Sequence, residues 1–85
     1  MLKISVQATA KGVMTLLLAG QVSGPWVAEL ERVCNNLLAQ GGSLMLDLEE
    51  VSFIDREGIR LLRHLQQQHV TFVHCSPFVV EQLRG

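Results

Sequence analysis

Few side chains in this 85-residue sequence have the type and spacing that catalysis requires. Asp47 lies between apolar neighbours, but no second carboxylate, nucleophile or histidine lies at a defined spacing from it. General acid–base catalysis therefore has no pair of groups, and we interpret Asp47 as a polar contact at the end of a strand. The glycine patterns G-x-x-x-x-G-K-[ST] and G-x-G-x-x-G are both missing from the sequence. The sequence predicts neither a catalytic residue nor a cofactor.

The histidines and cysteines are not spaced as metal ligands. His64 is expected on the exposed face of a helix, and His69 in a turn. His74 and Cys75 are adjacent, so in a strand they would point to opposite faces and could not hold one ion together. Cys34 falls on an apolar helical stripe and is predicted to be a small buried hydrophobe. We therefore predict no metal site. Two cysteines make no disulfide framework, which fits a reducing cytoplasm.

Composition narrows the class of protein further. The chain is 48% hydrophobic and 18% charged, which is typical of one folded domain, here predicted to span residues 1–85. Seven Lys and Arg residues against eight Asp and Glu residues give no basic field for a nucleic-acid partner or for anionic lipid. The longest apolar run, residues 14–20, is too short to insert into a bilayer, and the first residues lack a signal-peptide pattern. We expect a cytoplasmic protein.

The elements that position these residues begin with a predicted hairpin. Leu2, Ile4 and Val6 alternate with polar residues, as in a half-buried strand. Residues 10–12 are expected to form a turn, with Gly12 supplying a positive φ. Residues 13–19 are apolar at both odd and even positions, which favours a strand that is covered on both faces or lies in mid-sheet.

A helix is predicted from Pro25, capped by Ser23 or Gly24 and ended by the two glycines at positions 41 and 42. Its apolar stripe follows helical spacing: Val27, Leu30, Cys34, Leu37 and Leu38. Beside Pro25, Trp26 is expected either to pack on the end of the sheet or to stay exposed as a binding anchor.

A second set of elements follows in the same alternation. Residues 44–48 are predicted to form a buried strand, and residues 49–52 a loop that leads to Asp55. A helix begins there with four inward residues: Ile59, Leu61, Leu62 and Leu65. A last strand over residues 70–73 precedes a short helix capped by Ser76 and opened by Pro77. The predicted order is β-β-α-β-α-β-α, which implies a parallel or mixed sheet with right-handed crossovers.

Residues 46–62, LDLEEVSFIDREGIRLL, resemble the STAS family, named for sulfate transporters and anti-sigma factor antagonists. The matching positions, in order and spacing, are Leu46-Asp47-Leu48, Val51, Phe53-Ile54-Asp55 and Gly58. The resemblance implies an α/β domain of the stand-alone bacterial type, with helices packed on one side of a four- or five-stranded mixed sheet. It also implies a non-enzymatic binding module. In the bacterial regulators of this family, a kinase that is also an anti-sigma factor phosphorylates the hydroxyl directly after the Asp, which releases the partner.

This sequence departs from the family pattern at that position. Arg56 stands where the hydroxyl residue would be, and Arg carries no hydroxyl that such a kinase could phosphorylate. A phosphate at a helix N-terminus is favoured by the helix dipole, whereas a guanidinium there is disfavoured, and Glu57 in the first turn partly restores the usual preference. We predict that the phosphoswitch is absent at this site. Ser52 is the nearest upstream hydroxyl that could replace it.

The other residues of this segment have structural roles that compete with partner binding. Asp55 is placed to accept hydrogen bonds from the first amides of the second helix. Gly58 is expected to allow the close approach of a helix or a partner. Arg56 and Glu57 are expected to be exposed, either as solvated residues or as partner contacts. The predicted partner-binding residues are Ser52, Asp55, Arg56, Glu57, Gly58 and Arg60.

Two functions fit these expectations. The first is a regulatory protein-interaction module whose partner is an anti-sigma factor or another kinase-like ATPase. The alternative is a soluble accessory subunit of an ABC-type lipid transporter, with transporter subunits as partners. The apolar end of the chain is expected either to pack into the core or to form a homodimer face, through Phe78, Val79, Val80 and Leu83.

Overall fold

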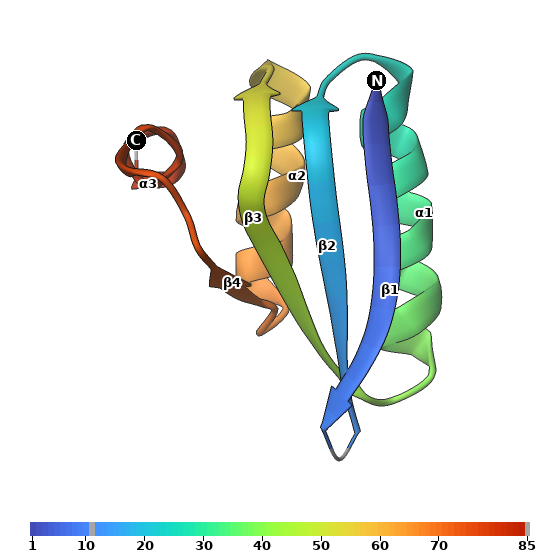
Figure 1. The fold of residues 1–85 in the computed structure, drawn as a ribbon. Coiled ribbons are helices and arrows are strands. Elements are labelled where there is room, and N and C mark those ends of the chain that lie inside the picture. Colours follow the sequence, from blue (N-terminus) through green and yellow to red (C-terminus); the bar gives the residue numbers. More distant parts are fainter. Residues whose placement is uncertain (11, 85) are drawn as a thin grey trace.

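The structure is a computed structural model that describes residues 1–10 and 12–84. Its elements follow the predicted order, β-β-α-β-α-β-α (Figure 1). Their bounds are β1 Leu2–Ala10, β2 Val13–Val22, α1 Pro25–Ala39, β3 Ser43–Ile54, α2 Arg56–Gln67, β4 Thr71–Val73 and α3 Pro77–Arg84.

The four strands form one mixed sheet in the order β1-β2-β3-β4. The β1–β2 pair is antiparallel, which confirms the hairpin, and the β2–β3 and β3–β4 pairs are parallel. Of the two alternatives for residues 13–19, mid-sheet is correct, since β2 has a neighbour on each side. Gly12 has the positive φ of +70° that the turn requires, while Lys11 lies outside the described residues.

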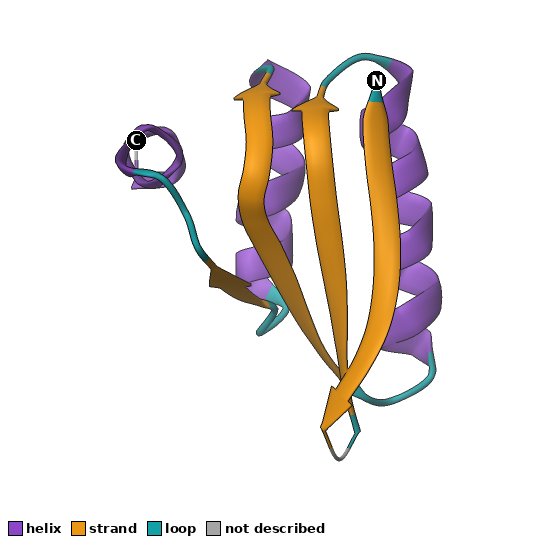
Figure 2. Cartoon of the chain, in the orientation of Figure 1, coloured by secondary structure: helices purple, strands orange, loops and turns teal. Residues whose placement is uncertain are grey.

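Two helices, α1 and α2, cover one face of the sheet (Figure 2). The short helix α3 lies beside the sheet, beyond β3 and β4, and contacts α2. Its predicted cap is confirmed, because the amide of Val79 donates to Ser76 Oγ at 3.2 Å. The opposite face of the sheet carries no helix within residues 1–10 and 12–84.

The core lies between the sheet and α1 and α2. The inward residues predicted for α2 are all buried, and Leu30 and Cys34 anchor α1. Burying one leucine side chain stabilises a fold by roughly 1.5–3 kcal/mol, so a few such contacts set the position of each helix. The strands contribute the alternate residues that face the helices: Leu16, Leu18, Val22, Leu44, Leu46, Leu48 and Ile54.

One local prediction is wrong. Residues 49–52 are not a loop, since β3 continues to Ile54. Two register irregularities, between Leu17 and Ala19 and between Gly20 and Gln21 on β2, give β3 extra residues there. Such bulges break the alternation that marks a strand in sequence. Of the two alternatives for the apolar residues of α3, Val79 and Leu83 pack on the core, whereas Val80 is 40% exposed.

Candidate functional site

The first turn of α2 lies where the carboxyl ends of β2 and β3 meet the start of α1. Asp55 is the N-cap of α2: its Oδ1 accepts from the amide of Gly58 at 2.8 Å. Its Oδ2 accepts from the amide of Gly24, the N-cap of α1, at 3.0 Å. The Gly24 and Gly58 amides lower the pKa of the Asp55 carboxyl. The predicted cap is therefore confirmed, and one carboxylate serves two helices.

Gly58 is buried against the domain's own strand β2. A Cβ added at Gly58 would lie 2.6 Å from the carbonyl oxygen of Val22 and 2.8 Å from Cγ2 of Ile54. The same carbonyl accepts from the amide of Asp55 at 3.1 Å. Of the two alternatives for this glycine, close approach by an internal element is what the structure contains. Gly58 is thus a packing residue and offers a partner no surface.

Three charged side chains near the start of α2 are accessible to a binding partner. Arg56, Glu57 and Arg60 are all exposed, as expected for the first two. Arg60 Nη1 lies 3.3 Å from Glu57 Oε1, an exposed pair that contributes little to stability. The guanidinium of Arg56 has no hydrogen-bond or ion-pair partner among the described residues.

These arginines line a groove between α2 and α3. We call it the arginine groove; its volume is about 430 Å³, and it is lined by Ile54, Asp55, Arg56, Ile59, Arg60, Arg63 and Gln82. Arg63 Nη2 donates to the carbonyl of Gln82 at 3.1 Å, while its Nε is buried without a hydrogen-bond partner. Three guanidinium groups and one carboxylate make the groove basic. No local sequence pattern marks Arg63 as part of this groove, because the position of α3 is not encoded locally.

Ser52 lies in the irregular part of β3. It is exposed, and its Oγ donates to the carbonyl of Gly20 at 3.2 Å. This hydrogen bond fastens β3 to β2 at the second irregularity. Ser52 therefore has a local structural role besides its place near the start of α2.

A second polar cluster was missed from the sequence. Asp47 Oδ1 accepts from the amide of Glu49 at 3.0 Å, and Oδ2 lies 3.0 Å from His74 Nδ1. The Glu49 amide chiefly, and His74 in addition, lower the pKa of Asp47. His74 lies just outside β4, which ends at Val73, and has a φ of +57°. This turn carries the imidazole back to β3 as a strand-end contact.

The same cluster has the donor atoms of a cation site without further signs of one. One ligand atom from each of Asp47, Glu49 and His74 lies within 4.8 Å of the others. Glu49 and His74 are exposed, and both Asp47 oxygens already accept hydrogen bonds or contact the imidazole. The contact between β3 and the chain after β4 accounts for this arrangement.

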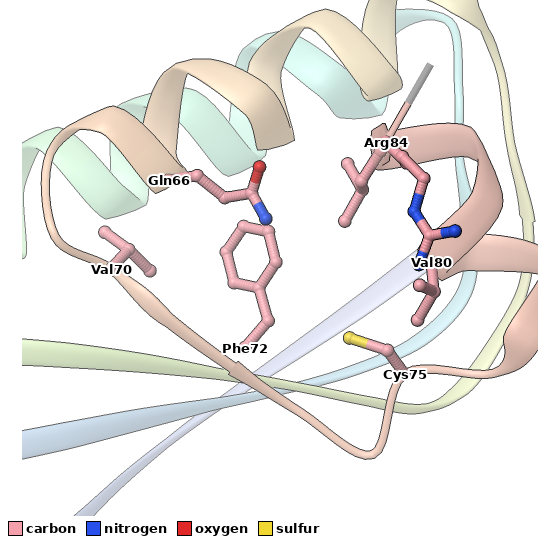
Figure 3. A pocket seen from close by; sticks show the side chains of 7 residues that line it. Gln66, Val70, Phe72, Cys75, Val80 and Arg84 are labelled. Atoms are coloured by element: carbon pink, nitrogen blue, oxygen red, sulfur yellow. The ribbon is translucent and has the colours of Figure 1, made fainter.

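Figure 3 shows a second pocket of about 420 Å³ between α2, β4 and α3. Its lining is mainly apolar, with Cys75 at one side. Burial, and secondarily Asp47, raise the pKa of the Cys75 thiol. Burial raises the pKa of Cys34 to about 12. Because the thiolate is the reactive form, neither cysteine is activated as a nucleophile.

Comparison with solved structures identifies the fold. The chain has the STAS-type fold, a four-stranded mixed sheet with three helices, as the resemblance implied. It is similar to the anti-sigma factor antagonist SpoIIAA in its unphosphorylated form, with a TM-score of 0.75 and 17% sequence identity. The match covers 96% of this chain and 82% of that one.

Sequence comparisons add nothing to this structural match. No protein-family model matches the chain, and no curated protein matches it either. Within the described residues, none of the helices has the length and apolar character needed to cross a bilayer.

Proposed function

We propose that the chain is a non-enzymatic, regulatory protein-interaction module that binds its partner at the start of α2. The contact surface comprises Ser52, Arg56, Glu57, Arg60 and the arginine groove, and Asp55 positions it by capping both helices. Its partner would be an anti-sigma factor or another kinase-like ATPase in the cytoplasm, since the fold is that of an anti-sigma factor antagonist. The observation that carries the proposal is the unpaired, exposed Arg56 in the first helical turn.

Electrostatics supports an acidic contact on the partner. A cation in the first turn of a helix is disfavoured by about 0.3–1 kcal/mol, so the charge of Arg56 does not stabilise α2. The positive end of the helix and the three guanidinium groups of the groove all attract an anion. A carboxylate from the partner would therefore occupy the region where the family's phosphorylated members carry their own negative charge.

The second candidate function is an accessory subunit of an ABC-type lipid transporter. It is favoured by the same residue, because a chain with Arg56 in place of the hydroxyl has no phosphoswitch at this position and suits a constitutive assembly. The two candidates differ in the partner: a transporter ATPase or permease in one case, a kinase-like regulator in the other.

Affinity capture from the native cell, followed by mass spectrometry, tests the proposal and separates the two candidates. We expect the wild-type chain to retain one partner in a salt-sensitive manner, and Arg56→Glu and Arg60→Glu each to reduce its recovery at least about tenfold. Arg32→Glu is the matched control, since Arg32 is an exposed arginine of α1 that pairs with Glu29. Equal recovery with all three variants, or no partner with the wild-type chain, would refute the surface.

A further inference from the structure

The sheet face opposite α1 and α2 carries side chains that are complementary to those of the same face on a second copy. Helices α1 and α2 occupy the other face, and the described chain leaves this one open (Figure 2). We propose that it binds a second copy of this chain, with the two sheets face to face and a two-fold axis running along β2. This inference does not rest on the proposed function, because neither the charged side chains of α2 nor the arginine groove takes part in the contact.

Strand register assigns the side chains of this face to rows across the sheet. In β1, Leu2 and Ile4 pack on the core, so Lys3 points to the open face. Lys3 is paired with Ala19 of β2, and Ala19 with Glu50 of β3. Lysine and glutamate thus stand one strand away from β2, on opposite sides of it.

The two neighbouring rows also carry different side chains on the two sides of β2. Toward the hairpin, Leu17 of β2 lies between Ser5 of β1 and Asp47 of β3. Toward the other end, the amide of Gln21 donates to the carbonyl of Met1 at 3.0 Å, and Gln21 is paired with Phe53. Met1 is 80% exposed and Phe53 46% exposed. Each row therefore has a different group on its β1 side and its β3 side.

A two-fold rotation about an axis along β2 exchanges these two sides. It places Lys3 of each copy over Glu50 of the other, so the contact contains two opposite-charge pairs. It also places Met1 over the Phe53 ring, and Ser5 over Asp47, whose carboxylate is held by the Glu49 amide and His74 of its own chain. Leu17 and Ala19 of β2 meet their own counterparts on the axis. The Lys3–Glu50 and Met1–Phe53 pairs are thus both complementary under this single operation.

The size of the face sets the expected strength of the dimer. The rows extend roughly 20 Å along the strands and 15 Å across them, at the usual strand rise and spacing. Sheets that pack face to face lie about 10 Å apart, which side chains of this size can fill. Because such an area is small for a protein–protein interface, we expect a dissociation constant of roughly 0.1 mM.

Charge-reversed variants, alone and mixed, test this arrangement. Sedimentation equilibrium of the wild-type chain at low salt, from about 10 µM to 2 mM, should show a monomer–dimer equilibrium. Lys3→Glu alone and Glu50→Lys alone each create two like-charge contacts and should weaken the dimer at least about tenfold. An equimolar mixture of the two variants, and the double variant, should both regain the wild-type affinity, because opposite charges then face one another again.

The control is Glu31→Lys, which makes the same charge change on exposed α1 and should leave the dimer unchanged. Rescue by mixing cannot come from an effect on folding, so it would support the proposed contact directly. A wild-type chain that stays monomeric at 2 mM would overturn the proposal. A dimer that ignores both reversals would also overturn it, and Phe78→Ser would then test the α3 face.

Discussion

The two longer helices begin side by side at the carboxyl ends of the strands, yet their first turns are stabilised differently. Helix α2 begins with a side-chain cap, Asp55, and an acid in its first turn, Glu57. Helix α1 begins at Gly24 with neither a capping side chain of its own nor an acid in its first turn. The amide of Gly24 is satisfied instead by the carboxylate of the other helix. The start of one helix can therefore depend on a residue 31 positions away in sequence. Local sequence motifs indicate the cap of α2 by Asp55 but not the contact of the same residue with α1.

Glycines sharpen the comparison, since each helix start contains one for a different reason. Gly58 is crowded by β2, so we expect Gly58→Ala to destabilise the fold by about 3 kcal/mol, as overpacking against backbone does. The free energy of unfolding from urea denaturation measures this loss. An alanine at exposed Gln67, also in α2, is the matched control and should change stability little. A Gly58→Ala variant as stable as the wild type would show that β2 and α2 are packed less closely than described.

Asp55 is the link between the two starts, and Asp55→Ala should be the next most damaging change. We expect a larger loss than for Ser76→Ala, which removes one cap hydrogen bond, from α3. The pKa of Asp55 is lowered in the fold, so its stabilisation is present above the ordinary value of 3.8 and is lost as the pH falls through the lower, folded-state value. Urea denaturation from pH 7 to pH 2 should therefore show wild type and Asp55→Ala converging below about pH 3.8. A constant difference down to pH 2 would contradict this role.

Gly24→Ala should have the smallest effect of the three. No atom of the described residues lies within 4 Å of the added Cβ, but Gly24 combines a φ of +54° with a ψ of −136°, which residues other than glycine rarely adopt. Alanine in such a conformation costs roughly 1–3 kcal/mol, and the reduced freedom of the unfolded chain returns about 0.4–1 kcal/mol. We expect a net loss of about 1 kcal/mol in urea denaturation. A loss as large as that of Gly58→Ala would mean that crowding, rather than backbone conformation, governs both sites.

Features that depend on neighbouring residues were predictable from the sequence. The cap at Asp55, the positive φ of Gly12 and Gly41, and the buried stripe of α2 all follow from local chemistry. The order of elements was also predictable, because alternating strands and helices leave few topologies, and the STAS-type fold was implied by the resemblance of residues 46–62 to that family.

Features that depend on contacts between distant residues were not predictable from the sequence. The extension of β3 required two irregularities whose register only β2 defines. His74 reaches Asp47 because it has a positive φ directly after β4, and the end of β4 is set by its pairing with β3. Arg63 joins the arginine groove only because α3 folds back beside α2. The proposed partner surface therefore includes Arg63 and leaves out the buried Gly58.

Because the Asp55 carboxylate contacts the starts of both α1 and α2, the Gly24 amide should respond to binding at α2. A binding partner that displaces the first turn of α2 must strain or break the hydrogen bond that the Gly24 amide donates to Asp55. The rate at which the Gly24 amide proton exchanges with solvent would then report the binding of a partner at the start of α2.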